Sequence, residues 1–230
     1  MTVTEVDSRP RFDHLILAVP DPEPVRRQLA EDWGLEVHSK GIAFEMGLAN
    51  VVVPLEPPEY LELLYVHDAD AYARQPDDEA KRRLLAGGGL QGWGLRTDDI
   101  EAVARELGVA LDEDMNLADG SRAPWRTIEK PGSPLGFPFY IQYDAPPQDR
   151  MATWTERLIA ANHRSPPGGT EWVEVTGDAA ELEEWLRPAR HLDVRVREGE
   201  PGMRAGVTVD GRLLTLSSDI AGGVEPALLS

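Results

Sequence analysis

Two side chains in the first third of the chain carry the groups most often used for acid–base or metal chemistry. His14 supplies an imidazole and Glu62 a carboxylate. Together they suit a divalent metal ion with open coordination positions. Without a metal they form either an acid–base pair, with Glu62 as the base, or a satisfied polar pair in a cavity wall. A metal-free pair lining a ligand pocket is the favoured prediction, because two strong protein ligands hold an ion poorly.

Two further candidates lie in the middle of the chain. Arg96 either binds a substrate carboxylate through two parallel hydrogen bonds or pairs with Asp98 or Glu101 at a strand edge. Trp125 either forms a wall of the ligand site or belongs to the ordinary core. The chain has no cysteine, so thiolate ligands and a cysteine nucleophile are excluded.

Strand periodicity predicts which of these side chains share a face. Alternate side chains of a strand point to opposite faces of a sheet. In HLILAV the leucines form the apolar face that meets a helix, which leaves His14 on the open face. In YLELLYV the same rule places Tyr60 and Glu62 on the open face.

The second half of the chain repeats this alternation. In GWGLR the open face receives Arg96, and in FYIQY it receives Tyr140 and Gln142. Two such open faces, curled together, make a cup. We therefore expect Tyr60, Tyr140 and Gln142 to contact a ligand in the cup.

A repeated pattern predicts the elements that position these residues. Three segments each contain a short strand, an aspartate that can cap a helix, and an amphipathic helix. They are HLILAVPDPEPVRRQL from His14, GWGLRTDDIEAVAREL from Gly92 and EWVEVTGDAAELEEWL from Glu171. Strand-like runs follow each helix, so the repeat predicts a βαβββ module.

The modules and their connectors divide the chain into five parts. We expect a first βαβββ module at 12–68, a connecting helix and linker at 69–89, a second module at 90–144, a linker helix at 145–170, and a partial third module at 171–217. The predicted fold class is α+β, with paired modules that form a curled mixed sheet around a central cup.

Short motifs in this order resemble the vicinal oxygen chelate superfamily, in particular its glyoxalase-like group of the glyoxalase, bleomycin-resistance and dioxygenase type. The motifs are Asp13-His14, Gly47 to Asn50, Tyr60-Leu61-Glu62, Asp119-Gly120, Trp125-Arg126 and Pro138-Phe139-Tyr140-Ile141.

The resemblance implies a divalent metal in the cup, held by the first and fourth strands of paired modules. Carried over to this chain, its ligands are His14 and Glu62, with Gly92 and Gln142 at the matching positions. Glycine offers no side chain and the glutamine oxygen is a weaker ligand than a carboxylate, so no cofactor is assigned and the metal stays an alternative. The resemblance also adds Asn50 to the ligand-binding residues.

Composition limits the partners. The net charge of −18, from 41 acidic and 23 basic residues, opposes binding to nucleic acids and anionic membranes. No apolar run is long enough to span a bilayer, so we expect a cytoplasmic protein with a small-molecule ligand. Modules of this family pair within one chain or between chains, so a homodimer is an open alternative.

Two functions follow from the sequence. The first is a glyoxalase-like protein that binds a small oxygen-rich or carboxylated metabolite in the cup. If it is catalytic, the resemblance implies lyase or isomerase chemistry with Glu62 as the base. The alternative is a metal-free, non-catalytic protein that binds small molecules, of the drug-sequestering kind.

Overall fold

The computed structural model describes residues 9–38, 41–132 and 134–225. Its elements, in chain order, are β1 Arg11–Ala18, α1 Pro22–Trp33, β2 Leu48–Pro54, β3 Tyr60–Val66, α2 Ala69–Ala73, α3 Glu79–Leu85, β4 Gly89–Arg96, α4 Ile100–Leu107, β5 Trp125–Ile128, β6 Phe139–Tyr143, α5 Pro147–Ala161, β7 Pro167–Gly177, α6 Ala179–Trp185, the 3-10 helix η1 Arg187–Ala189, β8 Val194–Glu198, β9 Gly202–Val209 and β10 Arg212–Ser217.

Paired modules form the first sheet, as the repeat predicts. Its strand order is β2-β3-β1-β4-β6-β5. The strand β1 is parallel to β3 within the first module, and β4 is parallel to β6 within the second. The two modules join through the antiparallel pair of β1 and β4. The predicted α+β class with a curled mixed sheet is confirmed.

The last part of the chain forms a second sheet with the order β10-β9-β7-β8. Along the chain its elements follow the expected sequence of strand, helix and three strands. Its first strand, β7, is parallel to the strand that follows the helix, β8. In the first module the parallel neighbour of β1 is instead the last strand, β3. The segment thus repeats the order of elements but arranges the strands differently.

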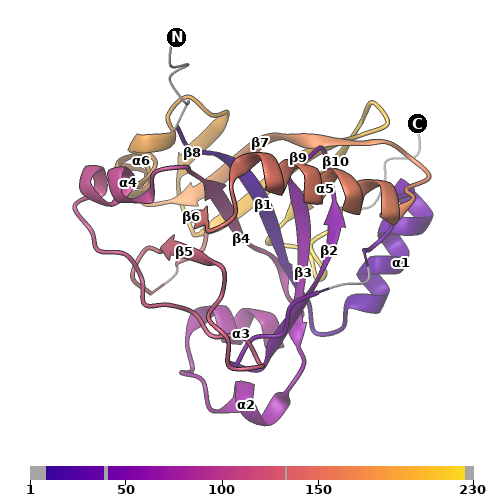
Figure 1. Ribbon diagram of the computed structural model, residues 1–230, viewed down its shortest axis with the longest axis horizontal. Helices are drawn as coiled ribbons and strands as arrows, with labels where there is room; N and C mark the ends of the chain where they lie inside the picture. The colour runs from indigo at the N-terminus through magenta and orange to yellow at the C-terminus, as the bar shows by residue number, and fades with distance from the viewer. Residues whose placement is uncertain (1–8, 39–40, 133, 226–230) are drawn as a thin grey trace.

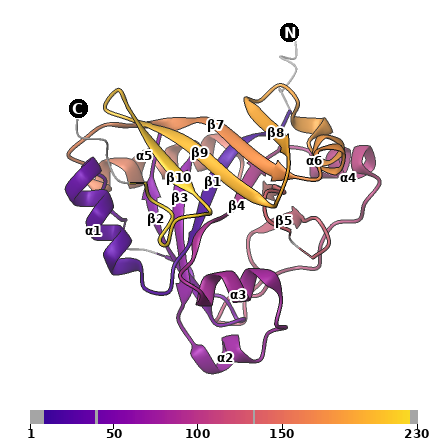
Figure 2. The same ribbon diagram turned by 180° about the vertical axis from the view of Figure 1, so that it is seen from behind.

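The two sheets and the helices form layers that leave one face of the first sheet for a cavity. The helix α5 crosses in front of the first sheet in Figure 1, and the second sheet covers the opposite face, where it lies nearest the viewer in Figure 2. Buried residues of both sheets and of α1 and α4, among them Leu17, Leu29, Trp93, Ile100 and Val207, form one core cluster. Removing this apolar surface from water is the main force that holds the layers together.

Aspartate caps begin the helices that cover this core. The carboxylates of Asp21, Asp99 and Asp178 accept hydrogen bonds from backbone N–H groups in the first turns of α1, α4 and α6. These bonds satisfy donors that have no partner inside the helix. The caps predicted by the repeat are confirmed. No helix in the described part of the chain is long and apolar enough to cross a membrane.

Two glycines with the same φ angle differ in how closely they approach other backbone atoms. Their substitution tests how closely the turn before β4 approaches the end of β1. Gly88 and Gly108 both have φ +71°, but a Cβ on Gly88 would lie 1.8 Å from the carbonyl oxygen of Ala18, whereas a Cβ on Gly108 would meet no described atom within 4 Å. We expect Gly108→Ala to lower the free energy of unfolding by about 1 kcal/mol, the cost of left-handed backbone alone. Gly88→Ala should cost at least ~2 kcal/mol more, because backbone must move.

Urea unfolding of the two variants measures this difference. Equal losses of stability for Gly88→Ala and Gly108→Ala would contradict the close approach of the turn to β1.

Candidate functional site

The strand β1 departs from regular pairing where the candidate site begins. Its register against β4 shifts between Phe12 and His14, which leaves Asp13 as an extra residue. Such a β-bulge re-aims side chains and is common beside active sites. Asp13 and His14 therefore enter the same polar network, although neighbours in a regular strand would face opposite sides.

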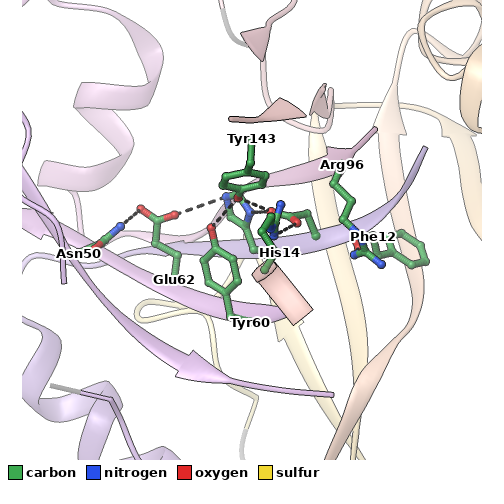
Figure 3. Close-up of polar contacts among 9 residues, drawn as sticks. Phe12, His14, Asn50, Tyr60, Glu62, Arg96 and Tyr143 are labelled. Carbon is green, nitrogen blue, oxygen red and sulfur yellow. Dashed lines mark hydrogen bonds and ion pairs between the residues drawn. The ribbon is translucent and has the colours of Figure 1, made fainter. Parts of the chain in front are cut away.

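A chain of polar contacts crosses the cup face from His14 (Figure 3). The Nε2 atom of His14 lies 3.5 Å from Oε2 of Glu62. The other oxygen of Glu62 accepts a hydrogen bond from Nδ2 of Asn50 at 3.0 Å. The amide oxygen of Asn50 accepts a bond of 2.7 Å from the backbone N–H of Ile42. This last bond fixes the orientation of the amide, so that Asn50 presents its N–H group to Glu62.

The carboxylate of Asp13 binds three side chains from three elements. It lies 2.8 Å from Nδ1 of His14, and it accepts hydrogen bonds from the hydroxyl of Tyr143 at 2.7 Å and from Arg150 at 2.8 Å. Asp13 is fully buried. Burial alone would raise its pKa, but the hydrogen bond to His14 and the charge of Arg150 outweigh it and hold the pKa well below the usual range.

These contacts determine where the protons of His14 lie. Because Asp13 is ionised it can only accept, so Nδ1 of His14 carries a proton. Nε2 is then the nitrogen that faces the carboxylate of Glu62, at a distance of 3.5 Å.

Aromatic rings hold the imidazole in place. The ring of His14 stacks on Tyr60 with 4.5 Å between centroids, and Tyr60 stacks on Trp154 of α5 at 4.2 Å. Phe139 meets the edge of the imidazole at 5.2 Å. The hydroxyls of Tyr60 and Tyr143 lie 3.3 Å apart. With this packing His14 has little freedom to turn away from Glu62.

The network forms one wall of a cavity of about 480 Å³ between the first sheet and α5. His14, Asn50, Tyr60 and Glu62 line it, together with Trp125. Most of the remaining lining is apolar: Ile16, Ile42, Phe44, Met46, Leu48, Val52, Leu64, Met115, Phe139 and Ile141. The size and lining are those of a site for a small organic molecule with few polar groups.

Two residues expected in the cup lie on the other face of β6. Tyr140 is fully buried, and its hydroxyl donates to the backbone oxygen of Trp185. Gln142 donates to the backbone oxygen of Asp98, and its side-chain oxygen accepts from the backbone N–H of Ile100. The prediction for both was wrong. The cup is itself apolar, so hydrophobicity does not distinguish the two faces of β6.

The prediction that Arg96 faces the cup was also wrong. Arg96 does not line the large cavity; it donates to the backbone oxygen of Phe12 (Figure 3) and borders a second, smaller cavity. The alternative partner Glu101 is bonded to Arg126 instead. The long side chain at the end of β4 extends past the rim of the cup.

The donor set does not fit a resident metal ion. The strand registers make Gly94 and Ile141 the second-module counterparts of His14 and Glu62. Gly92, the counterpart expected from the sequence, packs beside Ile16 rather than beside a ligand. Among the described residues no three His, Asp or Glu side chains converge on a point that could hold an ion. One module supplies two ligands and the other supplies none.

Several residues of the site escaped the sequence analysis. Strand alternation assigns Asp13 to the wrong face because the bulge interrupts it, and it assigns Tyr143 to the core. Arg150, Trp154 and Arg157 of α5 all line the cavity. Their spacing places them on one face of a helix. The sequence predicts this helix in the connector at 145–170 but contains no signal that places it against the cup.

Comparison with solved structures finds several similar chains. The structure is similar to a hypothetical protein from Staphylococcus aureus, with a TM-score of 0.61 at 15% identity over 90% of this chain and 98% of that one. A mutant of 4-hydroxymandelate synthase from Streptomyces coelicolor has a TM-score of 0.50 at 15% identity, over 91% of this chain and 63% of that one. A methylmalonyl-CoA epimerase from Streptomyces coelicolor is 22% identical over 60% of this chain and 100% of that one, with a TM-score of 0.42.

The sequence comparison assigns the family. No curated protein matches the sequence significantly. The model of the glyoxalase-like domain matches residues 12–191, which include both paired modules, α5 and part of the second sheet. This match, which covers most of the chain, shows that the chain belongs to the glyoxalase-like domain family of the vicinal oxygen chelate superfamily.

Proposed function

We propose that the protein is a metal-independent proton-transfer enzyme, an isomerase or lyase, that acts on a small and largely apolar molecule carrying a carbonyl group. The observation that carries the proposal is the contact of 3.5 Å between His14 and Glu62 in the wall of a cavity of about 480 Å³. A base and an acid beside a bound carbonyl compound can exchange a C–H proton.

Glu62 is the base in this proposal. Asn50 fixes one carboxylate oxygen and leaves the other toward His14. Glu62 takes the proton from the carbon next to the carbonyl. The electron pair of that C–H bond forms a C=C bond, and the electron pair of the C=O π bond moves to the oxygen. The Nε2–H group of His14 gives its proton to that oxygen and so forms an enol. Return of a proton to carbon completes an isomerisation.

Asp13 is a positioning residue for this step. By accepting the Nδ1–H group, it holds the imidazole in the tautomer whose Nε2 faces Glu62. Its carboxylate lies 2.8 Å from Nδ1 and so keeps the ring from turning Nε2 away from Glu62. Arg150 balances the charge of Asp13 from the other side, so the network is not left with an uncompensated buried anion.

The cavity lining supports an apolar ligand with an acidic end. Apolar and aromatic side chains make up most of the wall beside His14 and Glu62. Arg157 lines the same cavity from α5, where its guanidinium lies over the Trp154 ring at 4.6 Å from the centroid. A carboxylate of the ligand would find its charge partner there.

The second candidate is a non-catalytic protein that sequesters small apolar molecules. Its support is the wall built from Phe44, Met46, Met115 and Trp125, because aromatic and methionine side chains adapt to apolar ligands of varied shape. The two candidates differ in what Glu62 does: a base is needed for turnover, whereas a binding protein needs only the shape of the side chain.

Glu62→Gln separates the two candidates, because it keeps the shape and the acceptor for Asn50 but removes the base. The assay is loss of C–H signal by proton NMR in D2O for a panel of aliphatic and aromatic 2-oxo acids and 2-hydroxy ketones, with chelator-treated protein. We expect exchange of at least one compound by the wild type, a rate about 10²-fold to 10⁴-fold lower in Glu62→Gln, and a nearly unchanged Tm.

Thr153→Ser, a small change in another residue of the cavity lining, is the control and should keep the rate. A fully active Glu62→Gln variant, or exchange that appears only with added divalent metal, would overturn the proposal. Ligand binding that is equal in wild type and Glu62→Gln, without exchange, would select the sequestering protein.

Asp13→Asn tests the buried anion. It removes the charge that balances Arg150, so we expect a loss of about 3 kcal/mol of unfolding free energy at pH 7. The folded-state pKa of Asp13 is depressed below its ordinary value of 3.8. Its stabilisation is therefore complete above pH 3.8 and declines as the pH falls below that value. The difference between wild type and variant should be constant from pH 7 to pH 5 and shrink near pH 3.

Urea unfolding at these three pH values makes the measurement. Asp144→Asn is the matched control, because Asp144 is an exposed aspartate paired with Arg122 and exposed pairs contribute little. A difference for Asp13→Asn that grows toward pH 3, or one no larger than that of the control, would refute the role of the buried anion.

A further inference from the structure

A second cavity of about 90 Å³ lies behind the wall of the first and is lined by arginines. Arg9, Arg11, Arg96 and Arg150 all border it. Tyr143 and Arg150 also line the large cavity, so the two cavities share a wall. The proposed proton transfer uses none of Arg9, Arg11 and Arg96.

The charged residues around the small cavity are mostly positive, whereas the molecule as a whole is negative. The chain carries 41 acidic and 23 basic residues, yet four guanidinium groups border one small cavity. Asp98 is the acidic residue among the lining residues. Asp13 lies close by but is bonded to Arg150 and His14. A cluster of like charges at a concave surface creates a local potential that attracts anions even when the net charge repels them.

Two of the arginines are held in fixed positions. Arg96 donates to the backbone oxygen of Phe12, and Arg150 donates to Asp13 and lies with its guanidinium 3.3 Å from the centroid of the Tyr143 ring. A guanidinium has five N–H donors, so these bonds orient the side chains without using all of their donors. Such an arrangement binds an anion without first ordering the side chains.

The positive charges of the arginines also repel one another. Burial lowers the pKa of Arg96; Asp13 and Glu59 oppose this effect, while the charges of Arg150 and Arg11 add to it. The carboxylate of Glu59 accepts a hydrogen bond from the backbone N–H of Thr170, so it does not interact with Arg96 alone. An anion in the cavity would relieve the repulsion among these guanidinium groups.

The beginning of α5 also lies at the small cavity, although its first turn includes Asp149, which lines the large cavity. Pro147 and Arg150, in the first turn of this 15-residue helix, line the small cavity. The residue before the helix, Pro146, makes no side-chain capping bond. The amino end of a helix carries a partial positive charge that favours anions.

We propose that the small cavity binds a phosphate group or an equivalent tetrahedral oxyanion. Its volume suits a group of a few heavy atoms, and the planar fork of arginine matches the oxygens of phosphate. The group is either a free oxyanion or the phosphate end of an organic ligand. The proposal does not depend on the proton-transfer function.

Calorimetric titration with inorganic phosphate tests the site, at pH 7.5 and an ionic strength held constant with sodium chloride. We expect one phosphate to bind per chain. Arg9→Gln and Arg11→Gln change exposed residues, so folding is retained, and each should weaken phosphate binding about tenfold, the effect of losing one charge-assisted hydrogen bond. Arg26→Gln, an exposed arginine of α1 paired with Glu23, is the control and should bind as the wild type does.

Phenyl phosphate distinguishes the two sources of the oxyanion. Tighter binding of phenyl phosphate than of inorganic phosphate supports the phosphate end of an organic ligand, whereas equal binding supports a free oxyanion. No heat of binding for either compound above the chloride background would overturn the proposal. An equal loss in Arg11→Gln and Arg26→Gln would also overturn it, since the effect would then come from net charge alone.

Discussion

The buried carboxylate of Asp13 is the interaction on which the site depends. It joins His14 of β1, Tyr143 of β6 and Arg150 of α5, and so links the first module, the second module and the helix that covers the cup. An ionised carboxylate is stable in a protein interior only when donors and an opposite charge surround it. Each of the three partners is therefore needed where it lies, and the bulge that turns Asp13 into the network sets the position of the rest.

The two modules contribute different kinds of side chain to the site around Asp13. Because Asp13 fixes the proton on Nδ1 of His14, Nε2 is the nitrogen that faces Glu62. At the equivalent places of the second module stand Gly94 and Ile141. A Cβ on Gly94 would lie 2.9 Å from the imidazole of His14, so this glycine makes room for the ring. The first module thus carries the imidazole and the carboxylate, while the second supplies space for the ring and the hydroxyl of Tyr143.

Regular periodicity made about half of the site predictable. His14, Tyr60 and Glu62 lie in strands with clear alternation between an apolar and a polar face, and the structure places all three at the large cavity. The faces of β6 could not be assigned, because aromatic and apolar residues occupy both, and Tyr140 went to the wrong one. Asp13 was missed as a site residue since its role arises from a bulge, and sequence alternation contains no signal for an inserted residue. The contribution of α5 depends on a contact between distant segments.

The wall that separates the two cavities makes them physically coupled. Arg150 balances Asp13 and at the same time borders both cavities. A guanidinium that turned part of its positive field toward an oxyanion would offer less of it to Asp13, and the carboxylate would then attract the proton of His14 more strongly. The Nδ1–H group of His14 donates to this carboxylate, and Nε2 of the same ring lies 3.5 Å from Glu62. Under the two proposals, an oxyanion behind the wall would therefore act on the pair of His14 and Glu62 through Arg150 and Asp13.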